Sequence, residues 1–170
     1  GCSSASAATE AFCAAEPNYA GAVTTAITNG TLAAPAANNY NQTCQTNTGN
    51  DVAYSLSLPV NVQSLRIDTI GSTIADTVIS FKDASCGVQL GCDDDGDPAG
   101  NLSLLTVGQV PKGNYAIQVD SYNTNGANNG PFRLNVKGTV APGTVCTSPM
   151  FATGVLVCAT GTTCSAGICQ

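Results

Sequence analysis

The sequence contains no histidine and no tryptophan among its 170 residues. Without histidine, the chain cannot form a Ser-His-Asp triad, a histidine zinc site or a histidine-ligated haem. Without tryptophan, it has no indole platform for a sugar ring. Only 9% of the side chains are charged, so we expect the water-facing positions to be filled mainly by Asn, Thr, Ser, Gln and Gly. These absences exclude several classes of enzyme but do not by themselves define a function.

Cations are especially scarce, with five Lys and Arg against eleven Asp and Glu and a net charge of −6. Binding to nucleic acid depends on clustered cations that neutralise phosphates, and the cations form no cluster along this chain. We therefore expect no nucleic-acid partner. No run approaches the ~18 apolar residues of a membrane span, and no basic-then-apolar leader opens the chain. The sequence is thus typical of a mature, exported form without a membrane span.

Nine cysteines stand out in so weakly charged a chain. They show no Cys-x-x-Cys spacing, and no histidine accompanies them, so disulfides in an oxidising compartment explain them better than metal binding. We therefore expect a secreted, extracellular or cell-surface protein. Because nine is odd, at least one thiol lacks an internal partner, and we expect Cys2, in a small and flexible opening segment, to be unpaired or to join another subunit. A bond from Cys2 to Cys13, which leaves a different cysteine over, stays open as an alternative.

The positions of the other cysteines suggest a pairing. One pair is expected to close a short loop between strands, and a second to close the entry segment onto a polar loop. The last four cysteines allow three pairings, of which we expect the interlaced one because it crosslinks the tail in both directions. The expected pairs are Cys13–Cys44, Cys86–Cys92, Cys146–Cys164 and Cys158–Cys169.

Apolar and polar residues alternate along many short segments with turn-forming residues between them, and no amphipathic helical stretch competes. A period of two is typical of strands that bury one face. Asn29-Gly30, between residues 23–28 and 31–32, predicts a hairpin. The pattern predicts an all-β sandwich. The clearest expected strands are 52–58, 65–69, 76–82, 102–107, 115–122 and 131–137.

The two ends of the chain differ from this middle part. Residues 1–12 are rich in Ala and Ser and are expected to form a flexible or docking N-terminal arm. Ala141-Pro142-Gly143 has the composition of a linker. Residues 144–170 carry four cysteines and few large apolar groups, so we expect disulfides to hold this cysteine-rich tail. The expected division is therefore an arm (1–12), a sandwich (13–138) and a tail (144–170).

Several segments, in order, resemble the bacterial pre-peptidase C-terminal domain over about residues 13–137. The resemblance implies a jelly-roll-like antiparallel β-sandwich on a secreted bacterial protein, commonly C-terminal to a peptidase and associated with export, substrate attachment or the cell surface rather than with catalysis. No peptidase precedes the module in this sequence, so we expect a self-standing surface protein. The segments are Gly-Asn-Asp-Val-Ala-Tyr-Ser-Leu (49–56), Ala-Asp-Thr-Val-Ile (75–79), Cys-Asp-Asp-Asp (92–95), Lys-Gly-Asn-Tyr-Ala-Ile-Gln-Val-Asp (112–120) and Gly-Pro-Phe-Arg-Leu-Asn-Val (130–136).

The main cluster of charge lies in residues 93–97, four acids around one glycine. Carboxylates on a loop that can wrap are what Ca²⁺ requires, although the spacing does not match an EF-hand because Leu104 stands where the bidentate glutamate belongs. Two interpretations stay open: a calcium site, or a solvated turn in which Asp94 or Asp95 bonds loop amides. Adjacent acids on one turn do not flank a sugar from opposite sides, so we expect no enzyme. The candidate ligands are Asp93, Asp94, Asp95 and Asp97.

These features lead to a ranked set of functions. We expect first a non-enzymatic structural protein that forms homo-oligomers or filaments at the cell surface, because low charge reduces repulsion between copies and an odd cysteine permits a covalent link. The alternatives are a binding module for polysaccharide or a surface protein, through loops 93–100 and 123–130, or the accessory domain of a secreted peptidase. Tyr122, beside the second loop, is a candidate glycan contact.

Overall fold

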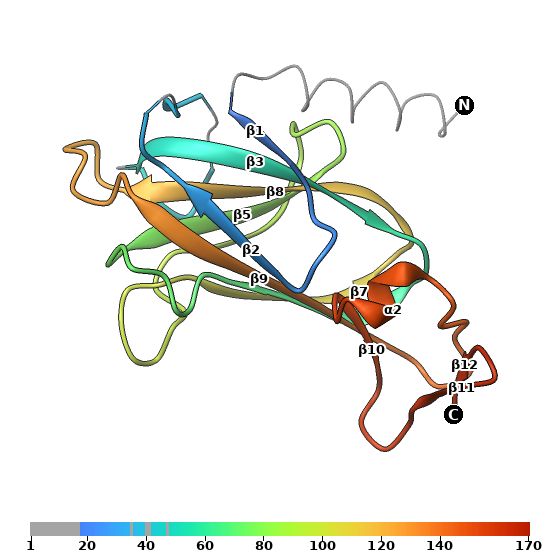
Figure 1. Ribbon diagram of the computed structural model, residues 1–170. Coiled ribbons are helices and arrows are strands. Elements are labelled where there is room, and N and C mark those ends of the chain that lie inside the picture. The colour runs from blue at the N-terminus through green and yellow to red at the C-terminus, as the bar shows by residue number, and fades with distance from the viewer. Residues whose placement is uncertain (1–17, 35, 40–41, 47) are drawn as a thin grey trace.

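The computed structural model describes residues 18–34, 36–39, 42–46 and 48–170. Most of them form two sheets that face each other across one core (Figure 1). Sheet A has the order β1 (Tyr19–Ala22), β3 (Thr48–Leu58), β8 (Gly113–Tyr122), β5 (Thr77–Asp83) and β6 (Gln89–Asp93). Sheet B has the order β10 (Leu156–Cys158), β9 (Pro131–Val140), β4 (Val62–Asp68) and β7 (Leu104–Val110), with β2 (Ile27–Thr31) also paired to β9.

The alternation in the sequence explains how the two sheets meet. Along β9, Phe132, Leu134 and Val136 are buried, whereas the residues between them lie on the outer face. Tyr54 of β3 reaches across the core to Phe132, and the two rings pack edge to face with centroids 6.3 Å apart. All pairs of strands within the two sheets are antiparallel except β1 with β3 and β10 with β9. The predicted all-β, jelly-roll-like antiparallel sandwich is confirmed.

The hairpin predicted at Asn29-Gly30 is wrong. Both residues lie inside β2, where Gly30 pairs with Phe132 of β9. A Cβ atom at Gly30 would overlap the Tyr54 hydroxyl and the Phe132 ring. Glycine therefore serves here as a site of close approach to the aromatic pair rather than as a turn residue.

Short elements without a clear alternation were not predicted. The edge strand β6 leaves Leu90 45% exposed, and β1, β10, β11 (Cys164–Ser165) and β12 (Ile168–Cys169) have four residues or fewer. The short helix α2 (Pro149–Ala152) begins after Ser148, whose side chain accepts a hydrogen bond from the Met150 amide. A proline in its first turn adds to this start signal. Within the described part of the chain, no helix has both the length and the apolar character that a membrane crossing requires.

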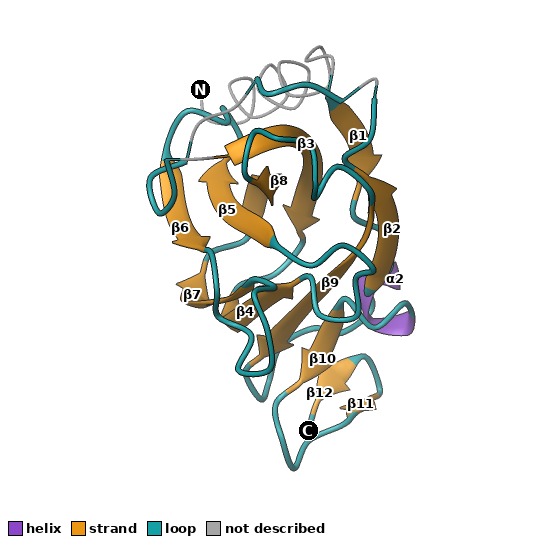
Figure 2. Cartoon of the chain, turned by 90° about the vertical axis from the view of Figure 1, so that its left-hand side faces the viewer, coloured by secondary structure: helices purple, strands orange, loops and turns teal. Residues whose placement is uncertain are grey.

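The cysteine-rich tail is joined to the sandwich by more than the chain itself. Strand β10 pairs in parallel with β9, and Val155 and Leu156 are fully buried in the shared core. Strands β11 and β12 form a small sheet beyond it, near the C-terminus (Figure 2). The disulfides Cys146–Cys164 and Cys158–Cys169 have the interlaced arrangement expected for this segment.

The pairing expected near the start of the chain is wrong in both its parts. Cys44 bonds to Cys92, which excludes Cys13–Cys44 and Cys86–Cys92, and Cys86 is itself disulfide-bonded. The expectation treated residues 86–92 as one loop, but Cys92 lies along β6, opposite Ser80 of β5 and away from the turn that contains Cys86. The arm 1–12, Cys2 and Cys13 lie outside the described residues.

Candidate functional site

Three carboxylates meet where β5 begins and β6 ends. These strands are antiparallel, with Ile79 opposite Asp93, so Asp76, just before β5, lies near the loop that follows β6. One carboxylate oxygen from each of Asp76, Asp94 and Asp95 lies within 4.8 Å of the others. The structure thus brings together two of the predicted calcium ligands and adds Asp76, which the sequence analysis missed because only the β5–β6 register reveals it.

The other two predicted ligands shape the loop. Asp93 Oδ2 accepts hydrogen bonds from the amides of Gly96 (2.9 Å) and Leu104 (2.7 Å). Asp97 Oδ1 accepts one from the amide of Ala99 (3.0 Å). These contacts are of the kind expected for a solvated turn, but Asp93 and Asp97 make them rather than Asp94 or Asp95. The acidic loop therefore divides its residues between two roles.

The electrostatics of the three-carboxylate cluster disfavour three free negative charges. Burial and, to a lesser extent, the charges of the neighbouring Asp95 and Asp94 together raise the pKa of Asp76 to about 6. Burial also raises the pKa of Asp94, although Gln45 Nε2 donates a hydrogen bond to its Oδ2 at 2.9 Å. One oxygen of Asp76 and one of Asp94 are buried without a hydrogen-bond partner. Hard oxygens in such a cluster have the chemistry of Ca²⁺ ligands.

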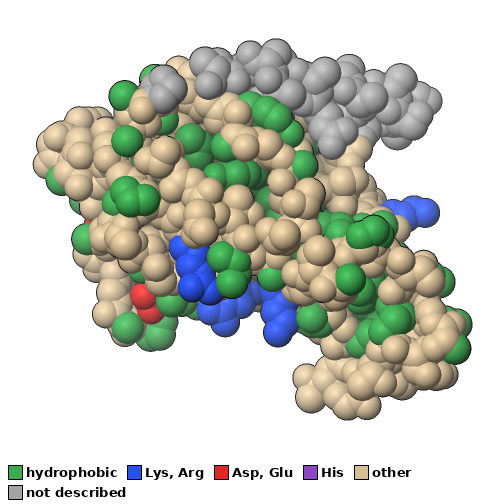
Figure 3. All heavy atoms as spheres, in the orientation of Figure 1, with side chains coloured by type: hydrophobic (Ala, Val, Ile, Leu, Met, Phe, Trp, Pro, Cys, Tyr) green, Lys and Arg blue, Asp and Glu red, His purple; other side chains and the backbone are tan. Residues whose placement is uncertain are grey.

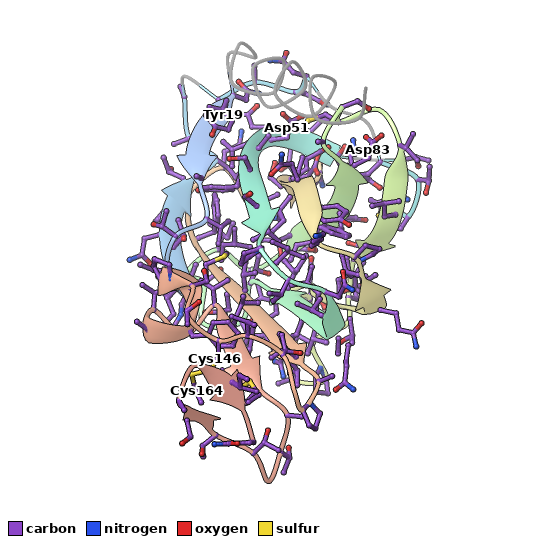
Figure 4. The ribbon with its side chains drawn as sticks, turned by 90° about the vertical axis from the view of Figure 1, so that its right-hand side faces the viewer. Tyr19, Asp51, Asp83, Cys146 and Cys164 are labelled. Carbon is purple, nitrogen blue, oxygen red and sulfur yellow. A yellow bond between two sulfur atoms is a disulfide. The ribbon has the colours of Figure 1, made fainter. Side chains whose placement is uncertain are left out.

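A second polar region lies on the outer face of sheet A, and it is covered. Asp51 of β3 and Asp120 of β8 are fully buried, and Lys82 of β5 is 5% exposed. Asp51 accepts hydrogen bonds from Asn18 Nδ2 (2.9 Å) and from the Asn39 amide (2.8 Å). Figure 4 shows Asp51 and Asp83 toward the end of the sandwich opposite Cys146 and Cys164. Residues 36–39 and 42–46 contribute to this cover, and the Cys44–Cys92 disulfide ties the second of these stretches to β6.

Asp120, under this cover, is a fully buried carboxyl group with a shifted pKa. Burial raises its pKa well above the ordinary value, Asp51 raises it further, and a hydrogen bond from Gln118 (2.8 Å) and the charge of Lys82 act in the opposite direction. Its Oδ1 atom is buried without a hydrogen-bond partner. Burial in turn lowers the pKa of Lys82, against the influence of Asp120 and Asp51. The region is an internal polar cluster that bears on stability.

The outer face of sheet B has the opposite character, because it is open and cationic. Arg66 of β4 lies directly opposite Lys137 of β9, and Arg133 lies four residues before Lys137 on the same face. These are three of the five Lys and Arg residues in the chain. Figure 3 shows Lys and Arg side chains gathered in a band over this part of the molecule. Although the cations form no cluster along the sequence, the fold gathers most of them on one face.

Two shallow cavities lie along this face, one on each side of Arg133. Both are bordered by β2 and β9, and together with the cations between them they form what we call the β9 groove. The first, of about 250 Å³, is lined by Ala26, Ile27, Arg66, Asp68, Asn135, Val136, Lys137 and Gly154. The second, of about 280 Å³, is lined by Asn29, Gly30, Gly71, Ser72, Thr73, Pro131, Phe132 and Arg133.

Asp68 is a negative charge within the groove, and its bonds are internal. Its Oδ2 accepts from Arg66 Nε at 2.8 Å. Its Oδ1 accepts from Asn135 Nδ2 (2.6 Å) and from the Ile70 amide (3.1 Å). With its side chain only 7% exposed, Asp68 holds the groove together rather than facing a ligand.

Tyr122, the predicted glycan contact, ends β8 and is partly buried. Its carbonyl oxygen accepts a hydrogen bond from Asn128 Nδ2 at 3.0 Å. The loop beside it is braced by its own short side chains, since Asn123 and Asn125 each accept from an amide two residues further on. A role for Tyr122 in binding stays a prediction.

No family model matches this sequence, and no curated protein matches it either. Among solved structures, the pre-peptidase C-terminal domain of a collagenase from Bacillus anthracis is 15% identical, with 71% of this chain and 93% of that chain covered and a TM-score of 0.43. It belongs to the family that the sequence resembles.

Two further matches have other roles. A periplasmic inhibitor of g-type lysozyme from Aeromonas hydrophila is 15% identical, covers 66% of this chain and 86% of its own, and has a TM-score of 0.38. A family 35 carbohydrate-binding module from Cellvibrio japonicus is 11% identical, covers 67% and 88%, and has a TM-score of 0.34. The likeness at these scores is loose, so the function has to be judged from the residues of this chain.

Proposed function

We propose that this protein is an extracellular, non-enzymatic binding module that attaches to polysaccharide through the β9 groove. The observation that carries the proposal is the groove itself, an elongated and open surface lined by amide, hydroxyl and guanidinium groups. Such groups exchange hydrogen bonds with the hydroxyls of a sugar chain. The three disulfides between described residues support folding in an oxidising compartment.

The position of β9 within its sheet favours a sugar chain over a peptide. Extended peptides commonly bind by adding a strand to a free sheet edge. Strand β9 pairs with β4 on one side and with β2 and β10 on the other, so its backbone is already engaged. The floor of the groove therefore offers side chains to a ligand.

The contacts of Asp68 support a binding role rather than hydrolysis. A glycosidase commonly uses two carboxylates on opposite sides of the scissile bond. Asp68 is the one carboxylate among the described lining residues of the two cavities, and both of its oxygens accept hydrogen bonds within the sheet. It is thus engaged in structure and is poorly placed to transfer a proton to a ligand.

The test of this function compares the β9 groove with residues 123–130, one of the two loops in which the sequence predicted binding. Affinity electrophoresis through gels containing neutral or charged polysaccharides measures binding of the full chain. Asn29→Tyr places a bulky side chain in the groove, and Thr124→Tyr places the same side chain in loop 123–130; both positions are exposed. We expect Asn29→Tyr alone to abolish retardation. Loss with Thr124→Tyr alone assigns binding to the loop, and no retardation by any polysaccharide rejects the function.

Calcium forms a second part of the proposal, because buried oxygens of Asp76 and Asp94 lack hydrogen-bond partners. We propose that Asp76, Asp94 and Asp95 hold Ca²⁺ in place of the set expected from the sequence. At a hundredfold excess over the dissociation constant, Ca²⁺ stabilises a protein by about 2.7 kcal/mol. We expect saturating CaCl₂ to raise the melting temperature, Asp95→Asn to remove this effect, and Asp97→Asn to retain it.

The pH dependence of calcium binding has a defined sign. Because the pKa of Asp76 is raised to about 6, its carboxyl is protonated at pH 5 and competes with the metal. Without calcium, the stability that this raised pKa contributes is present at low pH and falls as the pH rises through about 6. We expect calcium affinity, measured by calorimetry, to increase from pH 5 to pH 7. An affinity independent of pH over this range contradicts Asp76 as a ligand.

Self-assembly into homo-oligomers or filaments stays a prediction from the sequence. The structure describes a single chain. The N-terminal arm (residues 1–12), which was expected to dock on another copy, lies outside the described residues. Negative-stain imaging of concentrated native protein, with and without reductant, measures this directly. Monomers under both conditions reject assembly without affecting the binding function.

A further inference from the structure

We propose that the ligand of the β9 groove is an anionic polysaccharide whose charge comes from carboxylates, as in a polymer of uronic acids. This inference rests on the proposed binding function and specifies its substrate class. It is carried by the arrangement of Arg66, Arg133 and Lys137 on the outer face of sheet B.

Positive charge is unevenly distributed over the surface of this protein. The chain has a net charge of −6 and only five Lys and Arg, yet three of these lie on one open face. Two are exposed or nearly so, since the side chain of Arg66 is 49% exposed and Lys137 is exposed. A field of positive charge on an acidic protein attracts an anion to this face specifically.

The register of β4 and β9 places two cations side by side. Arg66 and Lys137 lie directly opposite each other on neighbouring strands, where like charges destabilise a sheet. Asp68 neutralises one of them through its contact with Arg66 Nε, so an excess of positive charge stays on the face. A bound anion neutralises this remaining positive charge, and that interaction adds to the binding energy.

Internal contacts leave the terminal nitrogens of both guanidinium groups available as hydrogen-bond donors. Arg66 engages Asp68 through Nε, and Arg133 engages Asn135 Oδ1 through Nε at 2.9 Å. The terminal nitrogens of both guanidinium groups donate no hydrogen bond to the described residues, so they can donate to a ligand. Guanidinium groups bind carboxylates through two parallel hydrogen bonds. The internal contacts thus fix each group in position without consuming the atoms that recognise a carboxylate.

The spacing of the cations along β9 favours a polymer over a small anion. Arg133 and Lys137 are four residues apart on β9, a distance of roughly 13 Å along a strand. A cavity flanks each of them, and Ile27, 47% exposed, lies in the first cavity and offers an apolar surface to a sugar ring. A chain with charges at intervals can contact both cations and fill both cavities, whereas a single carboxylate cannot.

The same features disfavour other anionic partners. Three cations give only a few phosphate contacts, which is little for a nucleic acid when the protein as a whole is acidic. The cations lie along the middle of a sheet face rather than on a protruding loop or a helix, which disfavours a lipid surface. An acidic peptide commonly needs the free strand edge that β9 lacks.

The experiment compares polymers that differ in charge alone. Calorimetry or affinity electrophoresis with the full chain uses polygalacturonate and alginate, which carry carboxylates, and methyl-esterified pectin, in which the carboxylates are neutralised. We expect binding to the two uronates and at least tenfold weaker binding to the esterified polymer. Increasing salt should weaken binding to the uronates, because exposed charges are screened.

Matched variants assign this selectivity to the groove. Arg133→Gln with Lys137→Gln removes two cations but leaves the Arg66–Asp68 contact in place, so the fold is expected to persist; circular dichroism and the melting temperature check this. We expect at least a tenfold loss of uronate affinity in this double variant. Lys112→Gln, which removes an exposed cation outside the described lining of the two cavities, should have no effect.

The outcomes distinguish a failure of the inferred anionic ligand from a failure of the proposed polysaccharide binding. Equal affinity for the esterified polymer and the uronates, or retention of affinity in the double variant, rejects the inference but leaves a groove that binds neutral glycans. Binding to polyglutamate as tight as to the uronates rejects a sugar in favour of an acidic peptide. Failure to bind either uronate, when neutral polysaccharides bind, rejects the inference alone, and failure with every polysaccharide rejects both.

Discussion

The outer faces of the two sheets carry charged residues in equivalent positions, yet their environments are opposite. On sheet A, Asp51, Lys82 and Asp120 project away from the core and are at most 5% exposed. On sheet B, Arg66 projects in the same sense from its strand and is about half exposed. The alternation along a strand therefore determines which residues leave the core but not whether water reaches them.

The difference comes from what lies over each face. The stretch 36–39 contacts sheet A through Asn39, whose amide donates to Asp51. The stretch 42–46 contacts it through Thr43, whose amide and hydroxyl both bond to Gln89 of β6. The Cys44–Cys92 disulfide fixes this segment in place. Sheet B keeps an accessible groove. A charged outer face of this sandwich is thus accessible only where no other segment of the chain covers it.

The largest expected effect comes from releasing the cover of sheet A. Replacing Cys44 and Cys92 with Ser opens a loop with a sequence separation of 48, and chain entropy predicts a loss of about 4 kcal/mol in the free energy of unfolding. The matched variant at Cys158 and Cys169, with a separation of 11, should lose about 3 kcal/mol. Denaturant unfolding measures both.

These two disulfide variants also distinguish the faces. We expect removal of Cys44–Cys92 to admit water to Asp120 and to move its pKa toward the ordinary value. Removal of Cys158–Cys169 should leave that pKa raised. Carboxyl NMR follows the titration of Asp120. If neither variant changes it, then residues 36–39 and 42–46 are not what isolates the outer face of sheet A from water.

An intermediate effect is expected at the inner side of the groove. Gly30→Ala places a methyl group against the Tyr54–Phe132 pair, and overpacking of this kind costs about 2 kcal/mol. Gly108→Ala, on β7, meets no atom within 4 Å and should change stability by less than about 0.5 kcal/mol. Equal effects at the two glycines contradict the close approach of β2 to the core.

The smallest effect concerns the charge under the cover of sheet A. Burial raises the pKa of Asp120, so its protonated form is favoured by folding, and stability falls as the pH rises through the raised pKa. Asp120→Asn mimics the protonated form and should flatten this decline, with a gain on the order of 1 kcal/mol at neutral pH. Urea unfolding across a pH series measures it.

Asp83→Asn provides a control of opposite sign. Burial acts to raise the pKa of Asp83, but hydrogen bonds from Ser85, Val88 and Gly87 outweigh it, and the net direction is downward. Stability from this group is present above the unfolded pKa and lost as the pH falls. The Asn variant should therefore be less stable than the parent at neutral pH, and the difference should vanish on acidification. A decline at alkaline pH for this variant contradicts the assignment.

Local patterns predicted the strands that alternate strongly. The clearest example is β9, whose buried Phe132, Leu134 and Val136 were recognised from their spacing alone. Asn29-Gly30 misled the prediction because a two-residue signal cannot reveal that Phe132, about a hundred residues away, occupies the space beside Gly30. The acidic loop was recognised as a stretch of sequence, but the division of labour among its carboxylates depends on how β5 and β6 pair.

The candidate groove was beyond the reach of such patterns. Arg66 lies on one strand, and Arg133 and Lys137 lie four residues apart on another. Each has the ordinary appearance of an outward-facing residue. Only the register of β4 against β9 brings Arg66 beside Lys137. Sites assembled from pairing across a sheet depend on contacts far apart in sequence, whereas the sequence patterns used to predict strands are local.

The pairing of β2 with β9 has a consequence for when this protein can become active. Thr31 pairs with Pro131, one hundred positions later in the chain, so β2 has to wait for its neighbour until most of the polypeptide has emerged. Contacts of such long range also form slowly. A nascent chain that has not yet reached β9 lacks the β9 groove, so the polysaccharide binding proposed for this groove requires that Pro131–Val140 has been synthesised and paired.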